Sequence, residues 1–203
     1  NSQYGVYANQ YSAPTISNST ISGNSSYGIR VDNYGAPTIA STTISNNSSY
    51  GIYAAYYPGD ITISDSTISN NSQYGIQSYY SYGDLTISGT TISGNSNGGI
   101  YHYHAYSGSS LTVSGSIISS NSGTGIQITY PQTALAFTIT NNTISSNSGN
   151  GIYYDNSSID YVSSPLPTIT YNTITANSNN GVYLGGSHSV ATINYNNIYE
   201  NSG

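Results

Sequence analysis

The sequence predicts an all-β fold, a right-handed single-stranded parallel β-helix (β-solenoid) that forms a single domain over residues 1–203. An Asn-Ser dipeptide recurs in phase nine times at intervals of 23 to 30 residues, which indicates about eight coils. Three apolar columns keep step with it, and their members stand next to small polar residues. Repeats of this length are typical of stacked units that bury their apolar faces only against their neighbours.

The first predicted strand of each coil begins with Gly, four residues after the Asn, and Ile or Val follows directly. We expect this Gly to allow a sharp turn or a close approach to the next coil. The distance to the following strand varies, so one loop per coil accommodates every insertion. The apolar column comprises Val6, Ile29, Ile52, Ile76, Ile100, Ile126, Ile152 and Val182.

The second and third strands are short segments such as Thr15-Ile16-Ser17 and Thr20-Ile21-Ser22, whose apolar centres always stand five residues apart. Alternation of polar and apolar residues predicts strands with one buried face, and no helical period is present. Three strands per coil therefore wind into three parallel sheets, right-handed because parallel crossovers prefer that hand. The columns are Ile16, Ile39, Ile63, Ile87, Val113, Ile139, Ile169, Ile193 and Ile21, Ile44, Ile68, Ile92, Ile118, Ile144, Ile174, Ile198.

The recurring Asn always stands three residues after the third column. We expect an inward-turned ladder in which each amide bonds the turn of the next coil, as stacked Asn side chains do in cross-β structures. Its role is structural rather than catalytic. The ladder comprises Asn1, Asn24, Asn47, Asn71, Asn95, Asn121, Asn147, Asn177 and Asn201.

The repeat resembles the parallel β-helix repeat of pectate-lyase-like and copper-nitrous-oxide-maturation (NosD-like) proteins over all 203 residues. The resemblance implies the β-helix fold. It does not select a function, because this repeat serves lyases, hydrolases, epimerases, adhesins and surface proteins alike. One coil carries the pattern as Thr43-Ile44-Ser45-Asn46-Asn47-Ser48-Ser49-Tyr50-Gly51-Ile52-Tyr53.

The composition excludes several partners. The chain has seven acidic residues and a single basic one, Arg30, which excludes a nucleic-acid interface and a polybasic membrane patch. No stretch of about 20 apolar residues is present to span a membrane. Cysteine is absent, and Ser, Thr, Asn, Gly and Tyr abound, so we expect a secreted or cell-surface, extracellular protein. The chain begins with Asn rather than Met, and a processed or truncated form is expected.

Glycosylation sequons are a further extracellular feature. Those at Asn24 and Asn47 belong to the buried ladder and are expected to be poor acceptors. We expect the remaining candidate N-glycosylation sites to lie on turns or loops, at Asn18, Asn46, Asn70, Asn141 and Asn156.

The titratable residues do not predict an enzyme, a metal or a cofactor. The resemblance to lyases implies a calcium-binding carboxylate cluster and a Lys or Arg base, whereas here Lys is absent and Arg30 has only Asp32 in its coil. Asp60 and Asp84 fall in phase, about 5 Å apart. We interpret them as loop-closing residues; a weak cation site and a catalytic dyad are the alternatives.

His102 lies at an inward-facing position, in phase with Ser78 and Ile128. A core histidine satisfied by hydrogen bonds is expected there, with a metal ligand, together with His104, as the alternative.

An outward column of Thr runs along the second strands, and flat Thr-x-Thr arrays resemble those of ice-binding β-solenoids. Thr also favours strands in general and bonds to its stacked copy. The column comprises Thr15, Thr38, Thr62, Thr86, Thr112, Thr138, Thr168 and Thr192.

Tyrosine supplies 24 residues and gathers on the first-strand face and its loops. Exposed Tyr in such number suits protein–protein contact or stacking against glycans. The residues concerned are Tyr53, Tyr56, Tyr57, Tyr79, Tyr80, Tyr82, Tyr101, Tyr103, Tyr106, Tyr153 and Tyr154.

Both ends of the repeat stand in the same phase, and no capping element is recognisable at either of them. Exposed strand edges invite head-to-tail addition of another copy, and a heterologous contact of this kind gives an open filament. The assembly residues would be Asn1, Val6, Ile16 and Ile21 at one end and Val182, Ile193, Ile198 and Asn201 at the other.

The sequence therefore predicts an extracellular structural subunit that forms a head-to-tail homopolymer, a filament or surface fibre. Three alternatives stay open. The chain is a fragment of a longer surface adhesin or glycan-binding β-helix, an ice-binding protein that uses its Thr faces, or a carbohydrate-active enzyme that uses Asp60 and Asp84.

Overall fold

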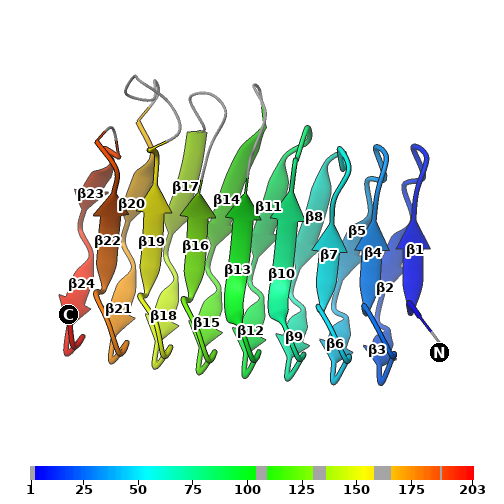
Figure 1. The fold of residues 1–203 in the computed structure, drawn as a ribbon, viewed down its shortest axis with the longest axis horizontal. Helices are drawn as coiled ribbons and strands as arrows, with labels where there is room; N and C mark the ends of the chain where they lie inside the picture. Colours follow the sequence, from blue (N-terminus) through cyan, green and yellow to red (C-terminus); the bar gives the residue numbers. More distant parts are fainter. Residues whose placement is uncertain (1–2, 104–108, 130–135, 158–165, 188) are drawn as a thin grey trace.

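The computed structural model describes residues 3–103, 109–129, 136–157, 166–187 and 189–203. These residues form three parallel sheets of eight strands each and contain no helix. The strands lie side by side along one axis, and the two chain ends lie at opposite ends of the stack (Figure 1). The all-β fold with three strands per coil is confirmed, and eight strands per sheet correspond to about seven full turns.

The first sheet, sheet A, contains the Gly-Ile strands. Its members are β1 (Val6–Ala8), β4 (Ile29–Val31), β7 (Ile52–Ala54), β10 (Tyr74–Tyr79), β13 (Gly98–Tyr103), β16 (Ile126–Thr129), β19 (Ile152–Asp155) and β22 (Val182–Gly185).

Sheets B and C contain the Thr-Ile-Ser strands. Sheet B comprises β2 (Thr15–Ser17), β5 (Thr38–Ala40), β8 (Ile61–Ser64), β11 (Leu85–Ser88), β14 (Ser110–Ser114), β17 (Ala136–Thr140), β20 (Thr168–Thr170) and β23 (Thr192–Asn194). Sheet C comprises β3 (Thr20–Ser22), β6 (Thr43–Ser45), β9 (Thr67–Ser69), β12 (Thr91–Ser93), β15 (Ile117–Ser119), β18 (Thr143–Ser145), β21 (Thr173–Thr175) and β24 (Asn197–Tyr199).

The register places like residues opposite like residues. Ile29 pairs with Ile52 in sheet A, Ile39 with Ile63 in sheet B and Ile44 with Ile68 in sheet C. From Ile16 to Ile174, every member of the second and third columns is at most 9% exposed. The three apolar columns predicted from the sequence therefore form the core.

Two corners of each coil use left-handed backbone, which explains the constant five-residue spacing between the second and third columns. The corner between sheets B and C has positive φ at Asn18, Ser41, Asp65, Gly89, Gly115, Asn141, Tyr171 and Tyr195. The next corner has it at Gly23, Asn46, Asn70, Gly94, Ser120, Ser146, Ala176 and Glu200. Small residues, Asn and Asp dominate both columns because they tolerate this conformation best.

The Gly before each first-column residue serves close approach rather than an unusual φ. A Cβ on Gly51 would lie 2.6 Å from the Gly75 carbonyl oxygen and 2.7 Å from Ile68 Cγ2. Of the two expectations for this glycine, close approach to the neighbouring coil is the one that the structure realises.

Candidate functional site

The recurring Asn side chains form a continuous buried ladder. Asn121 donates from its backbone N–H and from Nδ2 to Asn147 Oδ1, at 3.1 and 2.9 Å. Its Nδ2 also donates to the Ile92 carbonyl of the preceding coil at 3.2 Å. The same pattern connects the members from Asn24 to Asn201, whereas Asn1 lies outside the described residues. Each amide thus connects three coils, which makes the ladder a structural element.

A second buried polar ladder was missed by sequence reasoning. Each member's backbone N–H donates to the side-chain oxygen of the next member, as from Thr42 to Ser66 Oγ at 3.1 Å and from Asn142 to Asn172 Oδ1 at 2.9 Å. A Ser, Thr or Asn directly before every third-sheet strand was the available signal. The members are Ser19, Thr42, Ser66, Thr90, Ser116, Asn142, Asn172 and Asn196.

Asp60 and Asp84 are brought together, and both carboxylates accept hydrogen bonds from the backbone of the next coil. Asp60 Oδ1 accepts from Asp84 N at 2.9 Å, and Asp84 Oδ1 accepts from Ser110 N at 2.7 Å. Both side chains are exposed. This geometry favours the loop-closing interpretation, and the described residues contain no cluster of three or more His, Cys, Asp or Glu that could hold a metal ion.

His102 is buried as predicted, between its in-phase neighbours Ser78 and Ile128. The expectation that hydrogen bonds satisfy it is wrong, because neither Nδ1 nor Nε2 has a partner. Complete burial without a partner disfavours the imidazolium and lowers the pKa of His102 to about 4. The ring is therefore a neutral core residue at neutral pH. His104 lies outside the described residues.

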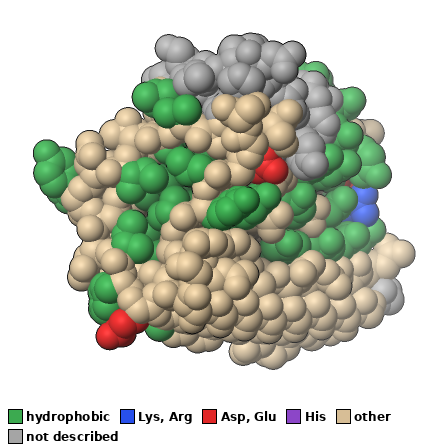
Figure 2. Space-filling view, turned by 60° about the vertical axis from the view of Figure 1, so that its left-hand side comes forward, with side chains coloured by type: hydrophobic (Ala, Val, Ile, Leu, Met, Phe, Trp, Pro, Cys, Tyr) green, Lys and Arg blue, Asp and Glu red, His purple; other side chains and the backbone are tan. Residues whose placement is uncertain are grey.

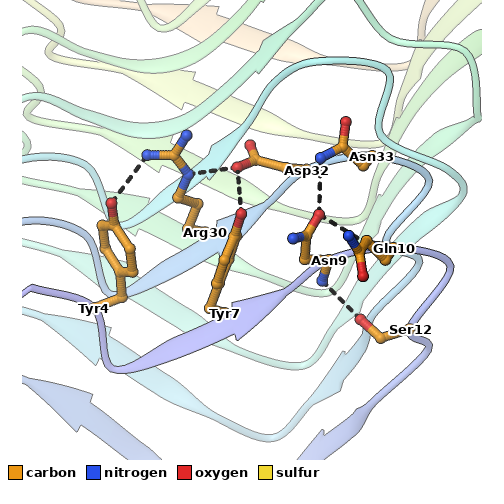
Figure 3. Close-up of polar contacts among 8 residues, drawn as sticks. All are labelled: Tyr4, Tyr7, Asn9, Gln10, Ser12, Arg30, Asp32 and Asn33. Carbon is orange, nitrogen blue, oxygen red and sulfur yellow. Dashed lines mark hydrogen bonds and ion pairs between the residues drawn. The ribbon is translucent and has the colours of Figure 1, made fainter.

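Arg30 is held within a polar and aromatic cluster on sheet A (Figure 3). Its Nε donates to Asp32 Oδ2 at 2.6 Å, and its Nη1 donates to the Tyr4 hydroxyl at 3.0 Å. Tyr7 donates to the same Asp32 oxygen at 3.0 Å. Burial acts to lower the pKa of Arg30, but the hydrogen bond to Asp32 and its charge outweigh this and raise it.

The cluster neutralises its own charge. The guanidinium lies 5.4 to 5.9 Å from the ring centroids of Tyr4, Tyr7, Tyr27 and Tyr53. Asp32 is only 2% exposed, and its second oxygen, Oδ1, is buried without a hydrogen-bond partner. With the cation enclosed by rings and paired to Asp32, this cluster has no free charge to offer an anionic substrate.

Tyrosines in sheet A and in the turns just before its strands stack on one another along the axis of the coils. Tyr4 and Tyr27 lie 5.3 Å apart at 8°, and Tyr27 and Tyr53 lie 4.9 Å apart at 12°. Because ring faces cover ring faces, this row offers edges and hydroxyls rather than open faces for stacking against a sugar.

The predicted tyrosine surface is only partly exposed. Tyr56, Tyr57 and Tyr82 are 55%, 40% and 45% exposed. Tyr53, Tyr79, Tyr80, Tyr101, Tyr103 and Tyr153 are half-buried. Tyr154 is a correction to the predicted surface: it is fully buried and packs edge-on against Phe137, because it occupies an inward position of β19. Tyr106 lies outside the described residues.

The predicted Thr column lies in register on the outer face of sheet B. Thr62 pairs with Thr86, Thr86 with Thr112, and Thr112 with Thr138. Each member is exposed or half-buried. The second outward row is less regular, since it contains Ser88, Ala40 and Asn194 in different coils.

Four of the five predicted glycosylation sites are accessible. Asn18, Asn46, Asn70 and Asn141 are exposed at the left-handed corners. Asn156 is a correction, because its side chain is fully buried after β19, and a glycan on it does not fit this structure.

The two ends of the stack differ. At the C-terminal end, Ile193 and Ile198 are 37% and 42% exposed. At the other end, Ile16 and Ile21 are only 9% and 8% exposed, and a hollow of about 330 Å³ is lined by Gly5, Thr20, Ile21, Ser22 and Asn24. Val6 and Val182 are half-buried. Hydrophobic side chains lie among polar atoms over the C-terminal end, which Figure 2 turns toward the reader.

Comparison with known families identifies the repeat. The family model described as right handed beta helix region matches residues 1–108 and 84–198. The chain belongs to the right-handed β-helix family. The predicted right-handed winding and the resemblance to parallel β-helix repeats are thereby confirmed.

Family membership here describes a fold, and it neither assigns nor excludes an enzymatic activity. No curated protein and no solved structure gave a significant match to the chain. Within the described residues, no helix is long and apolar enough to cross a membrane.

Proposed function

We propose that this β-helix is an extracellular structural subunit that stacks end to end with further copies into a filament or surface fibre. The observation that carries the proposal is the exposure of core residues on the last coil. Ile193 and Ile198 retain 37% and 42% of their surface, whereas Ile139 and Ile144, two coils earlier, are fully buried. A following coil would cover them completely.

The first coil of a second copy could pair with the last coil of the first copy in the same parallel register that pairs successive coils within the chain. Strands β22, β23 and β24 form one edge of the three sheets, and β1, β2 and β3 form the other. A second copy placed in phase would put Ile198 against the hollow beside Ile21 and would bring Asn201 into line with Asn24. The contact is heterologous and does not close, so it continues into a filament.

The energetics favour assembly driven mainly by backbone pairing. Covering the remaining surface of each exposed Ile is worth about 1 kcal/mol. That is small against the loss of translational and rotational freedom on association. The three strand edges must supply the rest through ladder hydrogen bonds, which predicts assembly that depends on protein concentration.

Electron microscopy of the purified chain over a range of concentrations tests the proposal. Filaments with an axial repeat of about 38 Å, eight coils at the β spacing, are expected. Ile198→Asp places a charge in the contact and should abolish them. Asn194→Asp changes an exposed outward residue of the same coil and should leave them intact. Short single particles of the unaltered chain at every concentration would refute the proposal.

In the alternative hypothesis, the chain is part of a longer adhesin, and a further coil of that adhesin covers Ile193 and Ile198. The intact mass of the natural polypeptide tests it, because the mass of a longer adhesin exceeds the 21.3 kDa of these residues.

The register of the Thr column supports a second candidate function, ice binding. Eight threonines stand in phase on sheet B at a regular axial spacing of about 4.8 Å. Thermal hysteresis of the purified chain, abolished by Thr86→Tyr in the middle of the column, is the expected signature. Gln77→Tyr on the outer face of sheet A, where Tyr53 and Tyr101 occupy the same column, is the matched control. Absence of hysteresis in the unaltered chain would exclude this candidate.

A further inference from the structure

Two pairs of exposed, stacked tyrosines lie near opposite ends of the coil stack. Tyr171 and Tyr195 are 57% and 75% exposed, with ring centroids 5.0 Å apart and planes at 12°. Tyr11 and Tyr34 are 76% and 39% exposed, with centroids 4.9 Å apart and planes at 6°. In each pair the two residues come from successive coils, so the rings face each other across a coil boundary.

Backbone conformation marks these positions as unusual for tyrosine. All four residues have positive φ, between 57° and 62°. The corner of Tyr171 and Tyr195 is occupied by Asn18, Gly89 and Asn141 in other coils, residues that tolerate this region. A bulky side chain there is strained, because the left-handed conformation brings its Cβ close to the following carbonyl oxygen. Strained, exposed aromatic residues in pairs are a feature that packing of the core does not require.

The composition directs one-electron oxidation toward tyrosine. The chain contains no Cys, Met or Trp and 24 Tyr. No sulfur or indole side chain is therefore present to be oxidised in preference to a phenol. An oxidant that reaches the surface meets exposed phenols first, and in these pairs a second phenol lies directly beside the first.

We infer that Tyr11–Tyr34 and Tyr171–Tyr195 are sites of oxidative coupling to dityrosine, which joins each end coil covalently to its neighbour. The oxidant is hydrogen peroxide acting through a haem peroxidase. Each phenol loses one electron and one proton to give a tyrosyl radical, and the two ring carbons ortho to oxygen form a bond. Each ortho proton then moves to its ring oxygen, which restores aromaticity. In total two hydrogen atoms are lost, and one hydrogen peroxide is reduced to two waters.

Both rings are exposed in each of these two stacked pairs, whereas the stacked pairs Tyr79–Tyr103 and Tyr153–Tyr183 each contain at least one half-buried ring. Tyr171 N donates to Asn194 O, and Tyr11 N donates to Asn33 O, so backbone bonds hold the two coils in phase. The exposed rings can tilt toward each other, since solvent surrounds them. In contrast, the half-buried Tyr4 and Tyr27 rings each lie within 5.7 Å of the Arg30 guanidinium, a cation that disfavours removal of an electron.

Peptide mapping after oxidation tests the assignment. The purified chain, at a concentration at which it is monomeric, is treated with horseradish peroxidase and hydrogen peroxide and is cleaved before Asp. The Tyr11–Tyr34 link joins peptide 1–31 to peptide 32–59, and the Tyr171–Tyr195 link lowers the mass of peptide 160–203 by two hydrogen atoms. Dityrosine fluorescence follows the extent of the reaction.

Two phenylalanine variants serve as reciprocal controls, because Phe preserves the stack but cannot form a phenoxyl radical. Tyr195→Phe should remove the mass change in peptide 160–203 and leave the other link, whereas Tyr34→Phe should do the reverse. Circular dichroism confirms that each variant is folded. Links at other tyrosines, or links only between copies, would overturn the assignment.

Coupling acts within one copy, so it holds whether or not copies stack end to end. Its consequence is measurable in the same samples. Covalent closure of an end coil restricts the unfolded chain as a disulfide does, and oxidation should raise the midpoint of thermal unfolding by roughly 5 °C. The doubly substituted chain, Tyr34→Phe with Tyr195→Phe, should show no rise. An equal rise in that variant would show that the stabilisation comes from elsewhere.

Discussion

Sheets B and C differ from sheet A in how strictly the repeat is kept. Between the second and third columns every coil has the same five-residue spacing, a left-handed corner and one polar ladder, and the Asn ladder follows three residues after the third column. After sheet A the loop varies in length, and the outward positions alternate among Tyr, Arg30 and Gln. A coil is therefore fixed where in-phase hydrogen bonds pass through it, whereas its other side can vary in sequence and acquire surface chemistry.

The largest expected effect is the loss of a ladder asparagine from the strict side. Asn121→Ala leaves the backbone N–H and Nδ2 of Asn95 and the Ile92 carbonyl without their side-chain partner, all of them buried. Each orphaned buried group costs about 1 to 3 kcal/mol, so the free energy of unfolding should fall by about 4 kcal/mol. Urea unfolding followed by circular dichroism measures it.

The matched control for this ladder variant is Ser122→Ala, the adjacent exposed position. It should change the free energy of unfolding by less than about 0.5 kcal/mol. Equal effects of the two substitutions would contradict a special role for the ladder.

Sheet A contains one buried titratable residue whose effect depends on pH. The pKa of His102 is about 4 in the folded chain and 6.5 in the unfolded one. Between pH 6.5 and 4, His102 therefore binds a proton in the unfolded chain but not in the folded chain. The free energy of unfolding is therefore unaffected by His102 protonation above pH 6.5, and it falls by about 3 kcal/mol as the pH drops to 4.

His102→Ile isolates this contribution, since Ile128 occupies the same inward column one coil later. The difference in unfolding free energy between the two chains should grow as the pH falls from 6.5 to 4 and then level off. A constant difference across this range would show that the ring finds a hydrogen-bond partner or water in solution.

How far the sequence predicts a feature depends on how exactly that feature repeats from coil to coil. The columns, sheets and Asn ladder could be predicted because each repeats with the same residue type at the same spacing in every coil. A strand that is ambiguous in one coil is then assigned from its copies in the others. The second ladder from Ser19 to Asn196 was missed because its members change among Ser, Thr and Asn, which hides a shared role. Tyr154 was misplaced because its residue type was weighed above its position, which alternates with Ile152 and pairs with Ile128 of the inward column. Asn156 was misplaced because the sequon was assigned to a loop, whereas the residue directly after β19 is still buried.

Partners of single side chains were the least predictable feature. Whether His102 forms a hydrogen bond depends on whether a polar atom of Ser78 or of another neighbour lies near its ring nitrogens, and the position in the column does not predict this.

Substitutions of two kinds of glycine should differ in cost: the first-column glycine, which is closely packed, and the corner glycine, which has positive φ. Gly51→Ala drives a methyl group against the Gly75 carbonyl and Ile68, and overpacking of this kind costs about 1 to 3 kcal/mol. Gly23 has positive φ and open space around it, and in-phase coils carry Asn46 and Asn70 there. Gly23→Asn should therefore be nearly neutral in thermal unfolding. The opposite ranking would mean that the neighbours of the first-column glycine move aside at little cost, and that close approach does not require glycine there.

The smallest expected effect lies in the Arg30 cluster of sheet A. Tyr7 shares Asp32 Oδ2 with Arg30, and Tyr7→Phe removes one of the two hydrogen bonds to this buried carboxylate while it keeps the ring. The free energy of unfolding should fall by about 1 kcal/mol. Tyr183→Phe, in the same outward column, keeps its stack on Tyr153 and should have no measurable effect. Because burial and Asp32 both raise the pKa of Tyr7, ultraviolet titration should show one fewer late-ionising phenol in Tyr7→Phe than in the unaltered chain. If both variants titrate and unfold alike, Asp32 is held by Arg30 alone, and the hydroxyl of Tyr7 contributes nothing to the stability of the cluster.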